Sequence, residues 1–104
     1  TDYNKMQIDG HIDEIMKTDR LKERWESFGW YAQQVDGHDF EALDEALEKA
    51  VAENERPSMI IADTIKGRGL PFAEGDFKNH NMPLSKEQAE EAFVALAREE
   101  EALV

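Results

Sequence analysis

The sequence contains no cysteine, which excludes disulfide bonds and thiolate metal sites. This absence fits a reducing compartment, so we expect a cytoplasmic protein. Basic side chains are scarce, because 12 Lys and Arg stand against 24 Asp and Glu and give a formal net charge of -12. Phosphate backbones and anionic membrane surfaces repel such an acidic chain, so we expect neither a nucleic-acid partner nor a membrane partner.

Long apolar runs are also missing from the sequence. No run approaches the roughly 20 residues that a membrane-spanning helix needs, and no basic segment followed by an apolar one suggests a targeting leader. The chain begins with Thr1 rather than Met and shows no start signal for a helix or strand there. We therefore expect the 104 residues to be part of a longer protein.

The stretch from 57 to 80 contains the clearest structural pattern. Residues 58–62 are mostly apolar, include the β-branched Ile60 and Ile61, and do not alternate with polar residues. This pattern is typical of a strand that is covered on both faces of a parallel sheet. A loop containing Gly67 follows, and ligands in open α/β sheets bind outside the carboxyl ends of the strands. The sequence therefore predicts a functional site in this loop.

Helical and extended patterns alternate along the rest of the chain. In the first third of the chain, the sequence predicts the end of a strand over 4–10, one helical turn within 11–18 and a helix over 20–28. It then predicts a strand over 30–35, a helix from Asp39 to near Asn54, and a last helix after Ser85. We expect the buried faces of the last two helices to contain Phe40, Leu43, Leu47, Ala50 and Val51, and Ala89, Phe93, Leu96 and Leu103. Such alternation favours an α/β fold with a parallel sheet and flanking helices.

Several polar residues near the predicted strand ends have side chains suited to binding. Asn4 offers an amide oxygen that can ligate Mg²⁺ or Ca²⁺, although an Asn alone is more typical of a turn. Met6 offers only its backbone carbonyl. Lys66 and Arg68 flank Gly67 and are able to face an anion, but solvated loop charges are the favoured explanation.

The three histidines differ in their sequence surroundings. His80 ends the long loop, where an imidazole is suited to donate a hydrogen bond to a phosphate oxygen or to move a proton near neutral pH. His38 lies in a turn just before a helix, where a structural role is favoured. We expect His11 to lie on the surface.

Taken together, these residues resemble the thiamine-diphosphate-binding region of transketolases, especially the N-terminal subunit of the split type. The resemblance covers nearly the whole chain and rests on D-Y-N-K-M-Q-I-D-G at 2–10, W-E-S-F-G-W at 25–30, V-D-G-H-D at 35–39, P-S-M-I-I-A-D-T-I-K-G-R-G at 57–69, and N-H-N-M-P-L-S at the end of the loop. It implies that the chain is the C-terminal part of a parallel-sheet thiamine-diphosphate-binding domain.

The resemblance also implies roles for individual residues. The Asn4 side chain and the Met6 carbonyl match the protein ligands of a divalent cation, Mg²⁺ or Ca²⁺. His80 matches a catalytic histidine that approaches the cofactor diphosphate and the sugar substrate. The implied contacts with thiamine diphosphate are Asn4, Ile8, Lys66, Gly67 and His80.

The family pattern is incomplete in residues 1–104. The G-D-G half of the cofactor motif is absent upstream of Asn4, so the chain is expected to be a partial domain that is inactive in isolation. The implied activity is transfer of a two-carbon ketol unit between sugar phosphates, with a C-terminal transketolase subunit or domain as partner and a dimer as the complete enzyme. Two alternatives stay open: a fragment of a deoxyxylulose-phosphate synthase-like enzyme, and a non-catalytic acidic interaction module on the same scaffold.

Overall fold

The structure is a computed structural model that describes residues 1–102. It contains, in chain order, β1 (Asp2–Tyr3), β2 (Met6–Gln7), β3 (Gly10–His11), α1 (Ile12–Ile15), α2 (Leu21–Ser27), β4 (Tyr31–Asp36), α3 (Phe40–Ala52), β5 (Ser58–Asp63), the 3-10 helix η1 (Phe77–Asn81) and α4 (Lys86–Ala102). The predicted alternation of helices and strands is confirmed. In residues 1–102, no helix is both long and apolar enough to cross a membrane.

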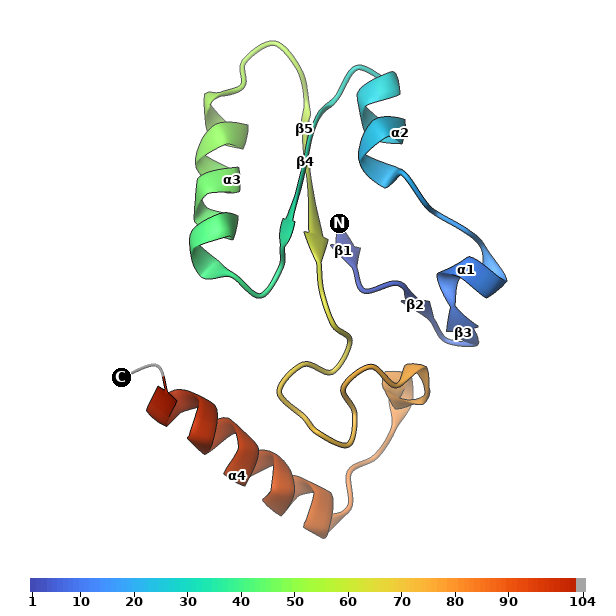
Figure 1. Ribbon diagram of the computed structural model, residues 1–104, viewed down its shortest axis with the longest axis vertical. Helices are drawn as coiled ribbons and strands as arrows, with labels where there is room; N and C mark the ends of the chain where they lie inside the picture. Colours follow the sequence, from blue (N-terminus) through green and yellow to red (C-terminus); the bar gives the residue numbers. More distant parts are fainter. Residues whose placement is uncertain (103–104) are drawn as a thin grey trace.

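Three strands that are distant in the sequence form one parallel sheet in the order β1-β5-β4. Figure 1 shows α3 and α2 on opposite sides of β4 and β5, so both faces of the central strand are covered. Ile61, in the middle of β5, is fully buried for this reason. The predicted α/β class and parallel sheet are confirmed, and β1 adds a third strand where the sequence indicated only a strand exit.

Side-chain caps fix the starts of the two long helices. The Asp39 carboxylate accepts hydrogen bonds from the backbone N–H groups of Glu41 and Ala42, as predicted for the N-cap of α3. At α4, the Gln88 N–H donates to the Ser85 hydroxyl while the Gln88 side chain accepts from the Ser85 N–H. This reciprocal pair is a capping box. It gives an acceptor to two backbone N–H groups that have no partner within the helix.

The predicted buried face of α3 is partly wrong. Ala46 is the residue of α3 that is fully covered, whereas Phe40 and Val51 are each 82% exposed and Leu47 is 55% exposed. The physical reason is that α3 packs mainly on β4 and β5, so it buries a narrow strip and leaves the neighbouring apolar flank open. That exposed flank is the sort of surface that marks an interface in a larger protein.

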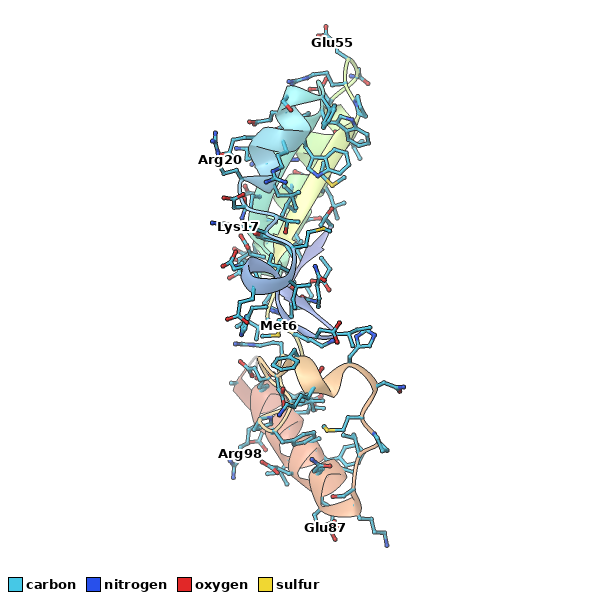
Figure 2. All side chains as sticks on the ribbon, turned by 90° about the vertical axis from the view of Figure 1, so that its right-hand side faces the viewer. Met6, Lys17, Arg20, Glu55, Glu87 and Arg98 are labelled. Atoms are coloured by element: carbon cyan, nitrogen blue, oxygen red, sulfur yellow. The ribbon has the colours of Figure 1, made fainter. Side chains whose placement is uncertain are left out.

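The predicted face of α4 needs a similar correction. Ala92 is buried, but Phe93 is 73% exposed and Leu96 is 46% exposed. Leu103 lies outside the described residues. Figures 1 and 2 show α4 and the loop before it lying beyond the end of the sheet, so no sheet covers the larger apolar side chains of this helix.

The chain is elongated for its length. Its radius of gyration is 16.7 Å, compared with about 13 Å for a compact domain of about 100 residues. Its shortest principal extent is 16 Å, against 51 Å for the longest. Residues 1–64 and 65–102 therefore form two parts, hereafter the sheet part and the loop part, and they meet at the carboxyl edge of the sheet (Figure 2).

Candidate functional site

The candidate site lies where the chain leaves β1 and β5. Tyr3 pairs with Asp63 in a parallel register, so Asn4 and Thr64 emerge at the same edge of the sheet. The Thr64 N–H donates to the Tyr3 carbonyl and joins these two exits. Figure 2 shows Met6 at the level where the sheet part meets the loop part. Asn4 and Met6 therefore lie on the same side of the sheet as the loop after β5.

One pocket of about 540 Å³ gathers most of the predicted site residues. Its lining consists of Asp2, Asn4, Met6, Gln7, Ile8, Asp9, Lys66 and His80. These residues come from three segments that are distant in the sequence: the exit of β1 with the β2 hairpin, the loop after β5, and η1. The fold therefore concentrates amide, carbonyl, ammonium and imidazole groups around a single space.

The predicted residue Gly67 lies outside the lining of this pocket. It lines a neighbouring hollow together with Leu70, Ala73 and Asn79. Its φ angle is 73°, and a Cβ atom there would come within 2.6 Å of the Ala73 carbonyl oxygen and 2.7 Å of the Asn79 side-chain nitrogen. The atoms that come close to Gly67 thus belong to later residues of the same loop. Because glycine has no Cβ atom, the loop can fold back against this position.

Local hydrogen bonds orient the Asn4 side chain. Its Oδ1 atom accepts from the Met6 N–H at 2.9 Å, and its Nδ2 group donates to the Asp2 carboxylate at 3.4 Å. Asp2 also accepts a hydrogen bond from the Thr64 hydroxyl. Because Oδ1 has two lone pairs, it can accept from Met6 and still offer one lone pair to a ligand.

The hairpin geometry leaves the Met6 carbonyl available. Met6 lies opposite His11 in an antiparallel pair, and the neighbouring Lys5 carbonyl accepts from the Ile12 N–H at 3.0 Å. Hydrogen-bonded and non-hydrogen-bonded pairs alternate along such a ladder, so Met6 occupies a non-hydrogen-bonded position. Its carbonyl is therefore not consumed by β3 and faces away from that strand.

These two oxygens suit a hard divalent cation. Mg²⁺ and Ca²⁺ prefer oxygen ligands, including amide and backbone carbonyls. Among residues 1–102, no group of three or more His, Cys, Asp or Glu side chains is arranged to hold a metal. The Asn4 amide oxygen and the Met6 carbonyl are oxygen donors that could form part of the coordination shell of such a cation.

Two side chains that can donate hydrogen bonds, Lys66 and His80, enter the pocket from the loop part. Lys66 forms no salt bridge with any of the described residues, although the carboxylates of Asp2 and Asp9 line the same pocket. His80 is exposed and belongs to η1, whose first turn is capped by the Asp76 side chain accepting from the Lys78 N–H. Both side chains can donate hydrogen bonds to an anion in the pocket.

His38 makes a structural contact, as its position in a turn indicated. Its Nε2 atom accepts a hydrogen bond from the Ile65 N–H at 2.8 Å, so the start of α3 is tied to the loop after β5. His38 lines a second hollow of about 370 Å³ rather than the pocket of Asn4. His11 is exposed, as expected.

An ion pair between Lys5 and Asp63 lies at the end of β5, where both residues line the smaller hollow. Burial of the Asp63 carboxyl opposes its ionisation, but the Lys5 ammonium and the Gln34 amide outweigh this and lower the pKa of Asp63. Lys5 Nζ lies 2.9 Å from Asp63 Oδ1, and Gln34 Nε2 donates to Oδ2 at 2.7 Å. Oδ1 accepts no hydrogen bond of good geometry from the described residues, so its attraction to Lys5 is chiefly electrostatic.

Comparison with known proteins decides the family. The family profile described as "Transketolase, thiamine diphosphate binding domain" matches residues 1–102. The chain belongs to the transketolase family. The crystal structure of transketolase from Campylobacter jejuni superposes with a TM-score of 0.80 at 32% sequence identity, over 90% of this chain and 15% of that chain. Transketolase from Leishmania mexicana gives a TM-score of 0.79 at 29% identity, over 88% and 14% of the two chains.

Curated relatives in this transketolase family are longer than the chain. The 6-deoxy-6-sulfo-D-fructose transketolase subunit SqwG of Clostridium sp. (strain MSTE9) is 44% identical over 95% of this chain, which spans 36% of that subunit. Transketolase 1 of Escherichia coli is 37% identical over 95% of this chain, which spans 14% of that enzyme. The chain thus corresponds to a minor part of each of these relatives.

Sequence reasoning missed three lining residues, namely Asp2, Gln7 and Asp9. Asp2 belongs to β1, and its role in holding Asn4 depends on a contact with Thr64, 62 positions later. No local pattern signals such a contact. The D-Y-N-K-M-Q-I-D-G motif of the resemblance contained all three residues, and it is the one signal that could have indicated them.

Proposed function

We propose that this chain forms part of the thiamine-diphosphate site of a transketolase-like enzyme, which transfers a two-carbon ketol unit between sugar phosphates. The observation that carries the proposal is the pocket at the carboxyl edge of the sheet. It joins the oxygen donors of Asn4 and Met6 to the hydrogen-bond donors of Lys66 and His80. A diphosphate with its divalent cation needs both kinds of group in one place.

Asn4 Oδ1 and the Met6 carbonyl would hold the divalent cation, Mg²⁺ or Ca²⁺. Both oxygens are hard ligands, and the remaining coordination positions are left for the diphosphate, water and protein groups outside residues 1–104. Thiamine diphosphate, when bound, supplies the carbanion chemistry of its ylid. This chain contributes binding, orientation and charge to the diphosphate end of the cofactor.

Lys66 and His80 would neutralise and orient the anionic groups. Lys66 reaches the pocket from the loop after β5, next to the close turn at Gly67, and presents an ammonium group to diphosphate oxygens. His80 reaches it from η1, where an imidazole N–H can donate to a diphosphate oxygen or to a hydroxyl of the sugar substrate. Ile8, which is 63% exposed, offers apolar surface to the cofactor ring system.

A second subunit or domain would complete the active site. Two relatives are named as subunits of transketolases: SqwG, and an apulose-4-phosphate transketolase subunit of Phocaeicola vulgatus, which is 33% identical over 88% of this chain. The exposed apolar flank of α3, with Phe40 and Val51, leaves surface for further parts of such an assembly. We propose a C-terminal transketolase subunit or domain as partner, a dimer as the working enzyme, and a cytoplasmic location.

The test uses the whole protein that contains this segment, together with its partner subunit if it has one. Wild-type protein should bind thiamine diphosphate in a Mg²⁺-dependent manner and transfer the ketol unit from a ketose phosphate to an aldose phosphate. Asn4→Ala should weaken Mg²⁺ binding by about a hundredfold, since a ligand to the cation is lost. Asn54→Ala is the matched control, because Asn54 lies beyond the end of α3, where its amide donates to the Ala52 carbonyl. Failure of the wild type to bind the cofactor would overturn the proposal.

A further inference from the structure

Lys5 separates the two oxygen donors of the pocket and has an unusual backbone conformation. It lies between Asn4 and Met6, and its φ angle is 62°. Residues with a Cβ atom rarely adopt this left-handed conformation, and lysine has no local side-chain hydrogen bond that favours it. The surrounding structure must therefore hold Lys5 in this conformation.

Two contacts hold the turn at Lys5. The Lys5 carbonyl accepts from the N–H of the buried residue Ile12 at 3.0 Å. The Lys5 ammonium lies 2.9 Å from Asp63 Oδ1 at the end of β5, and Asp63 is in turn bound by the side chain of Gln34 on β4. The turn is thus attached to β3–α1 through its backbone and to the parallel sheet through its side chain.

The Lys5 side chain lines a different hollow from the candidate pocket. Lys5 and Asp63 line the smaller hollow, whereas Asn4 and Met6 line the pocket that gathers Lys66 and His80. A direct contact between Lys5 and a ligand in the larger pocket is therefore not part of this arrangement. Lys5 can act on that pocket through the backbone it fixes.

We propose that Lys5 is a positioning residue, whose ion pair with Asp63 fixes the left-handed turn that presents Asn4 Oδ1 and the Met6 carbonyl to a divalent cation. This inference rests on the proposed function. Rotation about the Lys5 backbone would move one oxygen donor relative to the other, so a fixed turn reduces the conformational cost of binding the cation.

The test measures the apparent dissociation constant for Mg²⁺ by isothermal titration calorimetry, at saturating thiamine diphosphate, on the whole protein with its partner. Lys5→Ala and Asp63→Asn should each raise this constant about tenfold, as is common when a group supporting a metal ligand is lost. The double variant should be no weaker than the weaker single variant, because both substitutions break the same pair. Lys5→Arg, which keeps the positive charge, should restore most of the affinity.

Lys49→Ala provides the matched control, since Lys49 is similarly exposed and pairs with Glu45 at 3.1 Å on α3, away from the pocket. It should leave the dissociation constant for Mg²⁺ unchanged. If Lys5→Ala and Asp63→Asn lower the melting temperature while Mg²⁺ binds as tightly as in the wild type, the pair is merely structural and the inference is wrong. If the wild type itself binds neither Mg²⁺ nor thiamine diphosphate, the proposed function fails instead.

Discussion

The sheet part and the loop part of the chain are held together in different ways. In the sheet part, parallel strands pair residue by residue and Ile61 is fully buried between two helices. In the loop part, the buried side chains are those of Ala73 and Ala92, and short-range contacts such as the Gly75 N–H to the Lys66 carbonyl shape the loop. The sheet part therefore has a small core, whereas the loop part depends largely on turns and caps.

This difference matters for the pocket because each part contributes a different kind of group. The oxygen donors Asn4 and Met6 belong to the sheet part, where the register of β1 on β5 sets their place. Lys66 and His80 belong to the loop part, whose few buried contacts allow local adjustment. Under the proposed function, strand pairing would fix the oxygen donors to the cation, whereas the donors to the diphosphate and the substrate would belong to a loop that can adjust.

The largest expected effect that tests this comparison comes from His80→Ala in the whole protein. Loss of a charge-assisted hydrogen bond would cost about 1.5–3 kcal/mol, equivalent to a roughly ten- to hundredfold loss in cofactor affinity or turnover. His38→Ala should instead reduce stability, since it removes the acceptor for the Ile65 N–H that links the two parts.

Turnover and cofactor affinity should be measured side by side for His80→Ala and His38→Ala, with the exposed His11→Ala as control. If His80→Ala behaves like His11→Ala in both measurements, His80 has no role in the pocket. If His38→Ala lowers turnover as strongly as His80→Ala without affecting stability, the division between a binding residue and a linking residue is wrong.

An intermediate effect is expected from removing one helix cap in each part. Asp39→Ala and Ser85→Ala should each cost about 1 kcal/mol of helix stability, since each leaves backbone N–H groups without their acceptor. Because α3 packs on the sheet and α4 does not, Asp39→Ala should lower the global free energy of unfolding, while Ser85→Ala should increase local opening of α4.

Chemical denaturation and amide hydrogen exchange on the whole protein distinguish these two outcomes. Denaturation reports the global free energy of unfolding, and exchange within α4 reports local opening. Equal losses of global stability in Asp39→Ala and Ser85→Ala would show that the two parts unfold as one unit, contrary to the comparison.

The smallest expected effect concerns pH. The pKa of Asp63 is lowered in the folded chain, so the unfolded state binds the proton more tightly and folding favours the ionised carboxylate. The stabilisation is complete above the unfolded pKa of about 4 and is lost as pH falls through the folded pKa. Denaturation midpoints measured between pH 5 and pH 3 should therefore decline less steeply for Asp63→Asn than for the wild type.

Glu87 supplies the corresponding test in the loop part. Hydrogen bonds from its own backbone N–H and from the Ser85 hydroxyl lower the pKa of this carboxyl at the start of α4. Glu87→Gln should change the pH dependence of exchange within α4 and leave that of global unfolding almost unaltered. A global change as large as that of Asp63→Asn would contradict the separation of the two parts.

Local features could be predicted from the sequence because they depend on residues a few positions apart. The strand over 58–62, the N-cap at Asp39 and the cap at Ser85 follow from apolar runs and from polar side chains that satisfy nearby backbone groups. The family likewise followed from motifs in their order along the chain, and the profile match over residues 1–102 confirms it.

Long-range pairing was decided by the tertiary structure alone. Periodicity indicated that Phe40 and Val51 are buried, but the width of the surface that α3 meets on the sheet leaves both exposed. The place of Asn4 in one pocket with Lys66 depends on the parallel register of β1 on β5, and Lys5 pairs with a carboxylate that lies 58 positions later. Such contacts are set by backbone hydrogen bonds between distant segments, and no local pattern in the sequence specifies which segments meet.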